Sequence, residues 1–324
     1  MLREIKIGSR DSALALAQTR LVVELIARAH PRLRVRVVTM KTRGDLMPDT
    51  PFEEIPEREG KGLFTDALEK ALRGGEIDLC VHSLKDLAVN LDEALPIVGV
   101  ARRADPRDML VLPFHGVAGC FYAGAREALA AVRGPVGCGG PRRRVQLLSL
   151  APGLDIAPIR GNVPTRLSKL ESGGYGALVL AAAGLARLGM VWGEPGGILS
   201  GLPAVPAFLD YVFSVEEMVP AAGQGALALQ GRRGEDYGFL DAVRDPVTEE
   251  ETSAERVFIQ TLGCGCGSPA AAYARVSGNE VLIAGLYALN AEAPLFREEI
   301  AGGRKDAPRL ARELARSLAR KAGA

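Results

Sequence analysis

Two short strand patterns flank an amphipathic helix within the first forty residues, and this order constrains the fold more than any other feature of the chain. Residues 4–7 alternate polar and apolar side chains, and residues 35–38 form a second strand pattern. Between them, apolar residues recur at helical spacing after a cap at Asp11 and Ser12, and Pro31 ends the stretch. Because a crossover of this kind joins parallel strands, we predict a β–α–β unit of an α/β sheet.

The alternation of strands and helices starts again after residue 105, which predicts a second doubly wound domain. The apolar run at 226–229 suggests that the chain then returns to the first domain. From about residue 248 the order changes to a helix at 253–262, a turn rich in Gly and Cys, two strands and an amphipathic helix at 307–319, which predicts a small α+β domain. The predicted domains are 1–104 with 226–245, 105–225, and 246–324.

Size and composition are those of an ordinary globular protein with several domains. The 324 residues exceed what one hydrophobic core normally serves, and 48% hydrophobic residues with a net charge of +1 exclude a disordered chain or a polybasic nucleic-acid binder. The longest apolar stretch, 177–186, is far short of the roughly 20 residues of a membrane-spanning helix. Charges where a signal peptide would be apolar, and five cysteines that cannot all pair, predict a reduced, cytoplasmic protein.

Polar side chains follow the apolar strand pattern that ends near Val81. Ser83, Lys85 and Asp86 come directly after it, and ligands of open α/β sheets bind beyond the carboxyl ends of strands. A carboxylate held in a cleft beside Lys85 would stabilise a cation that develops on a substrate. The alternative is that Ser83 or Asp86 caps a helix and Lys85 lies in solvent.

Arginines stand at several other predicted strand ends. Only eight basic residues are lysine and the rest are arginine, which either reflects a GC-rich genome or serves to bind carboxylates and phosphates. The strand-end arginines are Arg10, Arg142, Arg143, Arg144, Arg160 and Arg166. If they are more than a solvated charge run, they predict a polyanionic ligand between the two α/β domains; no P-loop or GxGxxG sequence marks it as a nucleotide.

Two cysteines, Cys264 and Cys266, lie in a glycine-rich turn. A four-ligand zinc site is not expected, because no second cysteine pair exists and the chain has three histidines. A disulfide between residues two apart would be strained. Two interpretations remain. One is a reactive thiol in a turn whose glycines let a bulky group approach, and the other is a pair of inert cysteines.

The segment 43–62 has three glycines, three prolines, six acidic residues and no periodicity. A stretch of this length inside a compact domain is either disordered or a lid over a site. We predict a lid.

Eight motifs in order along the chain resemble those of the porphobilinogen deaminase family, also called hydroxymethylbilane synthases. They cover nearly the whole sequence and are highly specific in combination. They are GSRDSALA at 8–15, TRGD at 42–45, GKGLF at 60–64, VHSLKD at 81–86, DPRD at 105–108, RGNV with TRLSKL at 160–170, AGL with RLG at 183–189, and GQGA at 223–226.

The resemblance implies an enzyme with two domains like those of periplasmic binding proteins and a small third domain. Such a transferase of tetrapyrrole biosynthesis joins four porphobilinogens head to tail with loss of ammonia. A dipyrromethane cofactor, built from the substrate, is attached through a thioether to a cysteine that aligns with Cys266. The resemblance further implies a monomer with a small-molecule substrate, and no metal, nucleic acid or membrane as partner.

The resemblance also assigns roles to individual residues. Asp86 would be the catalytic carboxylate, and Lys61 and Phe64 would flank the lid. The cofactor would be held by Ser83, Lys85, Asp86, Gly139, Gly140, Arg142, Arg143 and Arg166. Substrate and growing chain would meet Arg10, Ser12, Arg160, Arg166 and Arg187.

Two hypotheses that assign the chain to other functional classes stay open on sequence alone. A non-catalytic two-lobed protein would bind a polycarboxylate reversibly and carry no covalent adduct. A thiol redox or metal-sensing module built on Cys264 and Cys266 would bind zinc or change its thiol count.

Overall fold

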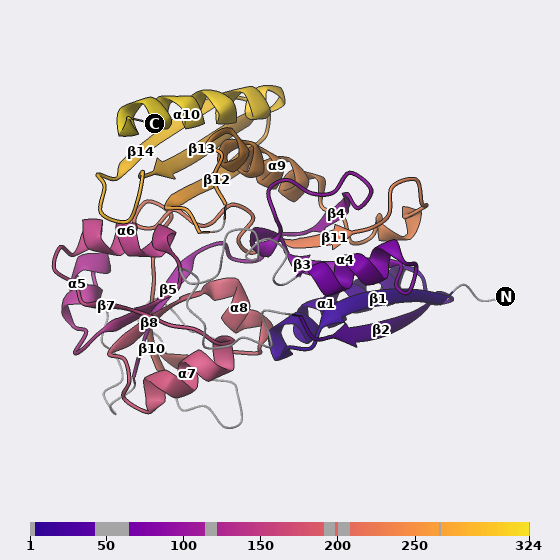
Figure 1. The fold of residues 1–324 in the computed structure, drawn as a ribbon, viewed down its shortest axis with the longest axis horizontal. Coiled ribbons are helices and arrows are strands. Elements are labelled where there is room, and N and C mark those ends of the chain that lie inside the picture. Colours follow the sequence, from indigo (N-terminus) through magenta and orange to yellow (C-terminus); the bar gives the residue numbers. More distant parts are fainter. Residues whose placement is uncertain are drawn as a thin grey trace.

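The computed structural model describes residues 4–42, 65–113, 122–190, 198–199, 208–265 and 267–323. Three β-sheets with their helices form three lobes, which follow the chain from the right of Figure 1 through its lower left to the top. Within these residues, no helix combines the length and apolar character that crossing a membrane requires. The architecture is the one predicted: two doubly wound α/β lobes and a small α+β lobe.

The first sheet has the strand order β2-β1-β3-β11-β4, in which β1 pairs in parallel with β2 and β3. This confirms the β–α–β unit. Side chains alternate between faces along a strand, so Val81 packs with helix α1 and Cys80 with helix α4. The elements are β1 (Glu4–Arg10), α1 (Ala13–Ala29), β2 (Arg34–Met40), α4 (Asp66–Arg73), β3 (Leu79–Ser83), the short 3₁₀ helix η2 (Leu84–Asp86), β4 (Ile97–Ala101) and β11 (Leu227–Gln230).

Strand β11 comes late in the chain yet lies antiparallel between β3 and β4. The chain therefore leaves the first sheet after β4 and returns to it. The two crossings touch, because the Ala104 amide donates to the Gly225 carbonyl (3.1 Å). Gly225 has φ +87°, and a Cβ there would lie 2.5 Å from the Ala104 carbonyl oxygen, so the crossing requires glycine. The domain boundaries themselves stay a prediction.

The second sheet has the order β7-β6-β8-β5-β10-β9 and forms the lobe at the lower left of Figure 1. Helices α5 and α6 pack on one face, and α7 and α8 on the other. The elements are β5 (Asp108–Pro113), α5 (Ala125–Ala130), β6 (Val136–Cys138), α6 (Pro141–Leu150), β7 (Ile156–Pro158), α7 (Val163–Glu171), β8 (Ala177–Ala181), α8 (Ala182–Arg187), β9 (Ile198–Leu199) and β10 (Phe208–Val212).

The third lobe is an antiparallel sheet, β12-β13-β14, covered on one face by helices α9 and α10 (Figure 1). The sequence predicts two of its strands and misses the third, because β14 is a half-exposed edge strand with charged residues. Its elements, with the 3₁₀ helices η3 and η4, are η3 (Gly238–Leu240), α9 (Pro246–Thr261), β12 (Ala270–Ser277), β13 (Glu280–Tyr287), β14 (Phe296–Gly303), η4 (Arg304–Asp306) and α10 (Ala307–Ala322).

A buried ion pair fixes the third lobe to the segment that connects the first two. Arg103 donates to both carboxylate oxygens of Glu255 on α9 (2.6 and 3.0 Å) and lies over the ring of Tyr273 (4.9 Å to its centre). Glu255 also accepts from the amides of Gly223 and Ala274. The third lobe is thus attached where the chain crosses between the two α/β sheets.

Candidate functional site

A pocket opens where the parallel strands β1 and β3 end. Arg10 is the last residue of β1 and Ser83 the last of β3, so the pairing of these strands brings both to one edge of the sheet. Ser12 caps the adjoining helix α1 by accepting from the Ala15 amide (3.3 Å). The pocket is lined by Arg10, Ser12, Leu14, Ala15, Gln18, Thr65, Val81, His82, Ser83 and Asp86. Four of the predicted site residues therefore meet here.

The turn η2 presents Lys85 and Asp86 directly after β3. Leu84 is buried and its amide donates to the Ala226 carbonyl (3.1 Å), which anchors the turn to β11. Asp86 is exposed, whereas the half-buried Lys85 donates to Gln224 Oε1 (3.1 Å). Burial lowers the pKa of Lys85 to about 8, although the neighbouring Asp86 carboxylate favours its charged form. A carboxylate open to a ligand thus stands beside a lysine held by a buried amide.

Arg142 and Arg143, at the start of α6, bind a carboxylate of the protein itself. Asp108 is fully buried and accepts from Arg142 Nη1 (2.8 Å), Arg143 Nε and Nη2 (3.1 and 2.7 Å) and Gln224 Nε2 (3.0 Å). Burial alone would raise the pKa of Asp108, but attraction by the two arginines holds it well below its usual range. The predicted contact of these arginines with the cofactor stays a prediction.

Gln224 connects the two α/β lobes through this cluster. Its Oε1 accepts from Lys85 of the first lobe, and its Nε2 donates to Asp108 and to the Pro106 carbonyl (2.7 Å). Because an ammonium can only donate and these oxygens accept, the amide orientation is fixed by its partners. The Lys85–Asp86 turn is therefore linked to the arginines of α6 by an unbroken series of hydrogen bonds.

The strand ends of the second lobe bring further arginines to the same side. Arg166, one turn into α7, donates from Nε to the Gly161 carbonyl (2.8 Å). Burial and repulsion from Arg143 and Arg160 lower its pKa to about 10. Gly139 lies against it: a Cβ at that residue would be 3.2 Å from Arg166 Nη1. A bound carboxylate would relieve the repulsion among these guanidinium groups.

Two other predicted residues, Gly140 and Arg187, have structural roles. Gly140 precedes α6 with φ +92°, a conformation that L side chains rarely adopt. Arg187, at the end of α8, donates to the Gly225 carbonyl (2.6 Å), and burial lowers its pKa to about 10. Arg187 thus binds the crossing between the lobes.

Lys61, Phe64, Cys266 and the predicted lid lie outside the described residues. Cys264 is half-buried against the core of the third lobe, and burial raises the pKa of its thiol. Because the thiolate is the nucleophile, Cys264 is a poor candidate for covalent chemistry at neutral pH.

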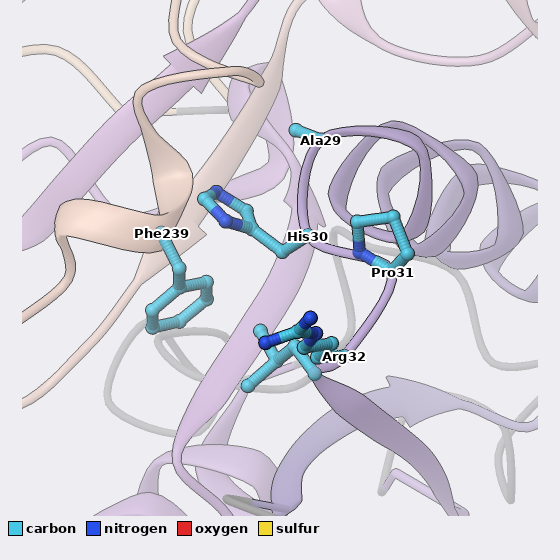
Figure 2. Close-up of a pocket in the computed structure, with 6 residues that line it drawn as sticks. Ala29, His30, Pro31, Arg32 and Phe239 are labelled. Carbon is cyan, nitrogen blue, oxygen red and sulfur yellow. The ribbon is translucent and has the colours of Figure 1, made fainter.

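A second, more open pocket lies at the far end of α1 (Figure 2). Its lining is Ala29, His30, Pro31, Arg32, Leu33 and Phe239, without a carboxylate. The 17 residues of α1 span about 25 Å at 1.5 Å per residue, which separates this pocket from Ser12 at the other end. It takes no part in the arrangement around Asp86.

Three residues of the site, Gln18, Asp108 and Gln224, are not predicted from the sequence as site residues. Asp108 and Gln224 belong to two of the family motifs, DPRD and GQGA. Their roles depend on contacts with residues more than 30 positions away in the chain. Gln18 gives no signal apart from following Leu14 and Ala15 on one helix face. Among the described residues, no group of three or more His, Cys, Asp or Glu could hold a metal ion.

Two family descriptions match the chain. Residues 5–238 match "Porphobilinogen deaminase, dipyromethane cofactor binding domain", and residues 250–321 match "Porphobilinogen deaminase, C-terminal domain". A porphobilinogen deaminase of Ruminiclostridium josui is 38% identical over 317 residues, covering 98% of each chain. That of Moorella thermoacetica is 39% identical over 325 residues, covering 99% of this chain and 95% of the relative.

Proposed function

This chain belongs to the porphobilinogen deaminase family, and we propose that it joins four porphobilinogen molecules head to tail into hydroxymethylbilane, releasing ammonia. The observation that carries the proposal is the placing of one exposed carboxylate, Asp86, among cationic side chains that come from both α/β lobes. Such a site suits a substrate that carries several acid groups and develops a cation during reaction.

The arginines of both lobes are the groups that we expect to bind the acid groups of the substrate. Each porphobilinogen carries an acetate and a propionate, and a growing chain accumulates carboxylates with every ring. Guanidinium groups bind carboxylates through paired N–H donors, which makes arginine suited to such a ligand. Arg10 in the first lobe and Arg160 and Arg166 in the second are the residues we assign to these acid groups.

Asp86 is the residue we assign to the chemical step. Loss of ammonia from porphobilinogen leaves a cation on the pyrrole ring and its methylene carbon. A carboxylate already fixed beside that carbon stabilises the developing charge more than it stabilises the neutral ring, so it lowers the barrier. Leu84, anchored to β11, keeps the turn that carries Asp86 in place.

The family description names a dipyrromethane cofactor, and the residues present fit a group of that kind. When bound, the cofactor supplies an anchored pyrrole onto which the chain is extended. Its acid groups match the donors of Ser83, Lys85, Arg142, Arg143 and Arg166. The repulsion that lowers the pKa of Arg166 is the kind that bound carboxylates offset. We propose that the backbone at Gly139 and Gly140 completes this set and that Cys266 holds the thioether.

We further propose a cytoplasmic monomer with domains 1–104 with 226–245, 105–225, and 246–324. The free thiols of Cys80, Cys138 and Cys264 support a reducing compartment. A site built from two lobes of the same chain needs no second copy. Gel filtration with light scattering tests the monomer, and limited proteolysis tests the boundaries.

The test of the function is Asp86→Asn, assayed for ammonia and hydroxymethylbilane. Turnover should fall by at least about 100-fold, the usual cost of losing one fixed transition-state partner, while the melting temperature stays unchanged because Asp86 is exposed. Asp92→Asn is the matched control, an exposed carboxylate six residues on that binds Arg73, and it should keep full turnover. Reversible binding of porphobilinogen by the wild type without product would refute the proposal.

A further inference from the structure

Gln18 is a buried amide on the face of α1 that looks into the site pocket. Residues three and four apart on a helix share a face, so Leu14, Ala15 and Gln18 together line the pocket. Gln18 is 4% exposed, and its Nε2 donates to Ser83 Oγ at 2.9 Å. The contact joins the first helix to the end of β3, 65 residues later.

The direction of this hydrogen bond determines what Ser83 can do. A hydroxyl has one hydrogen to donate and accepts through its lone pairs. Gln18 occupies the accepting side, and no acceptor for the Ser83 O–H is found among the described residues. Ser83 is half-buried and lines the same pocket as Arg10 and Asp86. Its donor is therefore left for a ligand oxygen.

We propose that Gln18 is a positioning residue: by donating to Ser83, it directs the Ser83 O–H toward a carboxylate oxygen of a bound pyrrole. The inference rests on the proposed function for the identity of that pyrrole. Without the amide, the hydroxyl rotates freely and spends part of its time accepting, a role in which it repels an anion. A hydrogen bond to a charged acceptor is stronger than a neutral one, so fixing its direction has a measurable effect on binding.

The test reverses the polarity at residue 18 while keeping its shape. Gln18→Glu replaces the donor with an acceptor that captures the Ser83 hydrogen, and it should slow the rate at which apoprotein incubated with porphobilinogen gains the mass of the cofactor, by about 10- to 100-fold. Gln18→Met removes the donor without adding charge and should slow this loading less. Gln260→Glu is the control, an exposed glutamine on α9 that donates to Asn90, and it should leave the loading rate unchanged.

Charge alone would also weaken anion binding, so each variant is repeated in a Ser83→Ala background. If Gln18 acts through the hydroxyl, both substitutions should slow cofactor loading by less than about threefold there. A second readout, KM for porphobilinogen in the loaded enzyme, should change less than the loading rate, because Ser83 is assigned to the cofactor.

Equal effects of Gln18→Glu in both backgrounds, or a Gln18→Met variant that matches wild type, would overturn the inference. Product formation by the wild type reports separately on the proposed function.

Discussion

Replacing Asp108 by asparagine tests whether the arginines of α6 depend on a carboxylate inside the protein. Asp108 is fully buried, and the side chains of Arg142 and Arg143 that it binds are only 10% and 8% exposed. Removing one partner of a buried ion pair leaves uncompensated charge and typically costs about 3–5 kcal/mol. At roughly 2–4 °C per kcal/mol for domains of this size, the melting temperature should fall by about 6–20 °C.

The matched control is Asp105→Asn. Asp105 binds Arg107 in the segment just before β5, and this pair is more open to solvent than the Asp108 cluster, with side chains 24% and 41% exposed. Exposed ion pairs contribute at most about 1 kcal/mol, so the control should melt within a few degrees of the wild type.

The effect of Asp108 should also depend on pH in one direction. Its pKa is lower in the folded chain than the value of about 3.9 in unfolded chains. Its stabilisation is therefore present above about pH 4 and lost as the pH falls toward the folded value. Thermal melts of wild type and Asp108→Asn should converge in acid. An Asp108→Asn protein that melts like the control at pH 7 would refute the buried cluster.

Two further predictions concern the lysine and the glycine of the site. Competitive acetylation from pH 6 to 11, with peptide mapping, should give Lys85 a pKa near 8, whereas exposed lysines titrate near 10.4; a value near 10.4 for Lys85 would contradict its burial. Gly140→Ser should slow cofactor loading of the apoprotein and destabilise the fold by about 1–3 kcal/mol, because serine is strained at φ +92°; loading at the wild-type rate would show that the loop can change shape.

Local patterns in the sequence predict most elements of the two α/β lobes. Helix α1 begins at its Ser12 cap and α6 at Pro141, as capping rules predict. Helix α9 begins at Pro246, seven residues before the predicted start at residue 253. The prediction depends on the spacing of apolar residues, and the polar first turn after the Asp245 cap gives no such signal. Strand β14 is missed for a similar reason, since its pattern of charges does not resemble a buried strand.

The sequence predicts several residues of the site but not which of them bind one another. Strand ends identify Arg10, Ser83 and Asp86, because parallel pairing gathers such residues at one edge of a sheet. No local pattern reveals that Asp108 binds the arginines of α6 or that Gln224 joins that cluster to Lys85. These contacts arise only when the chain crosses between the lobes and returns.

The most direct test of the central claim is the intact mass of the purified protein after incubation with porphobilinogen. We predict a mass excess of two pyrrole units, mapped by peptide analysis to Cys266, retained in Cys264→Ser and absent from Cys266→Ser. The half-buried Cys264, whose thiol pKa is raised, should stay unmodified. An unmodified wild-type chain, or an adduct on Cys264, would contradict the account.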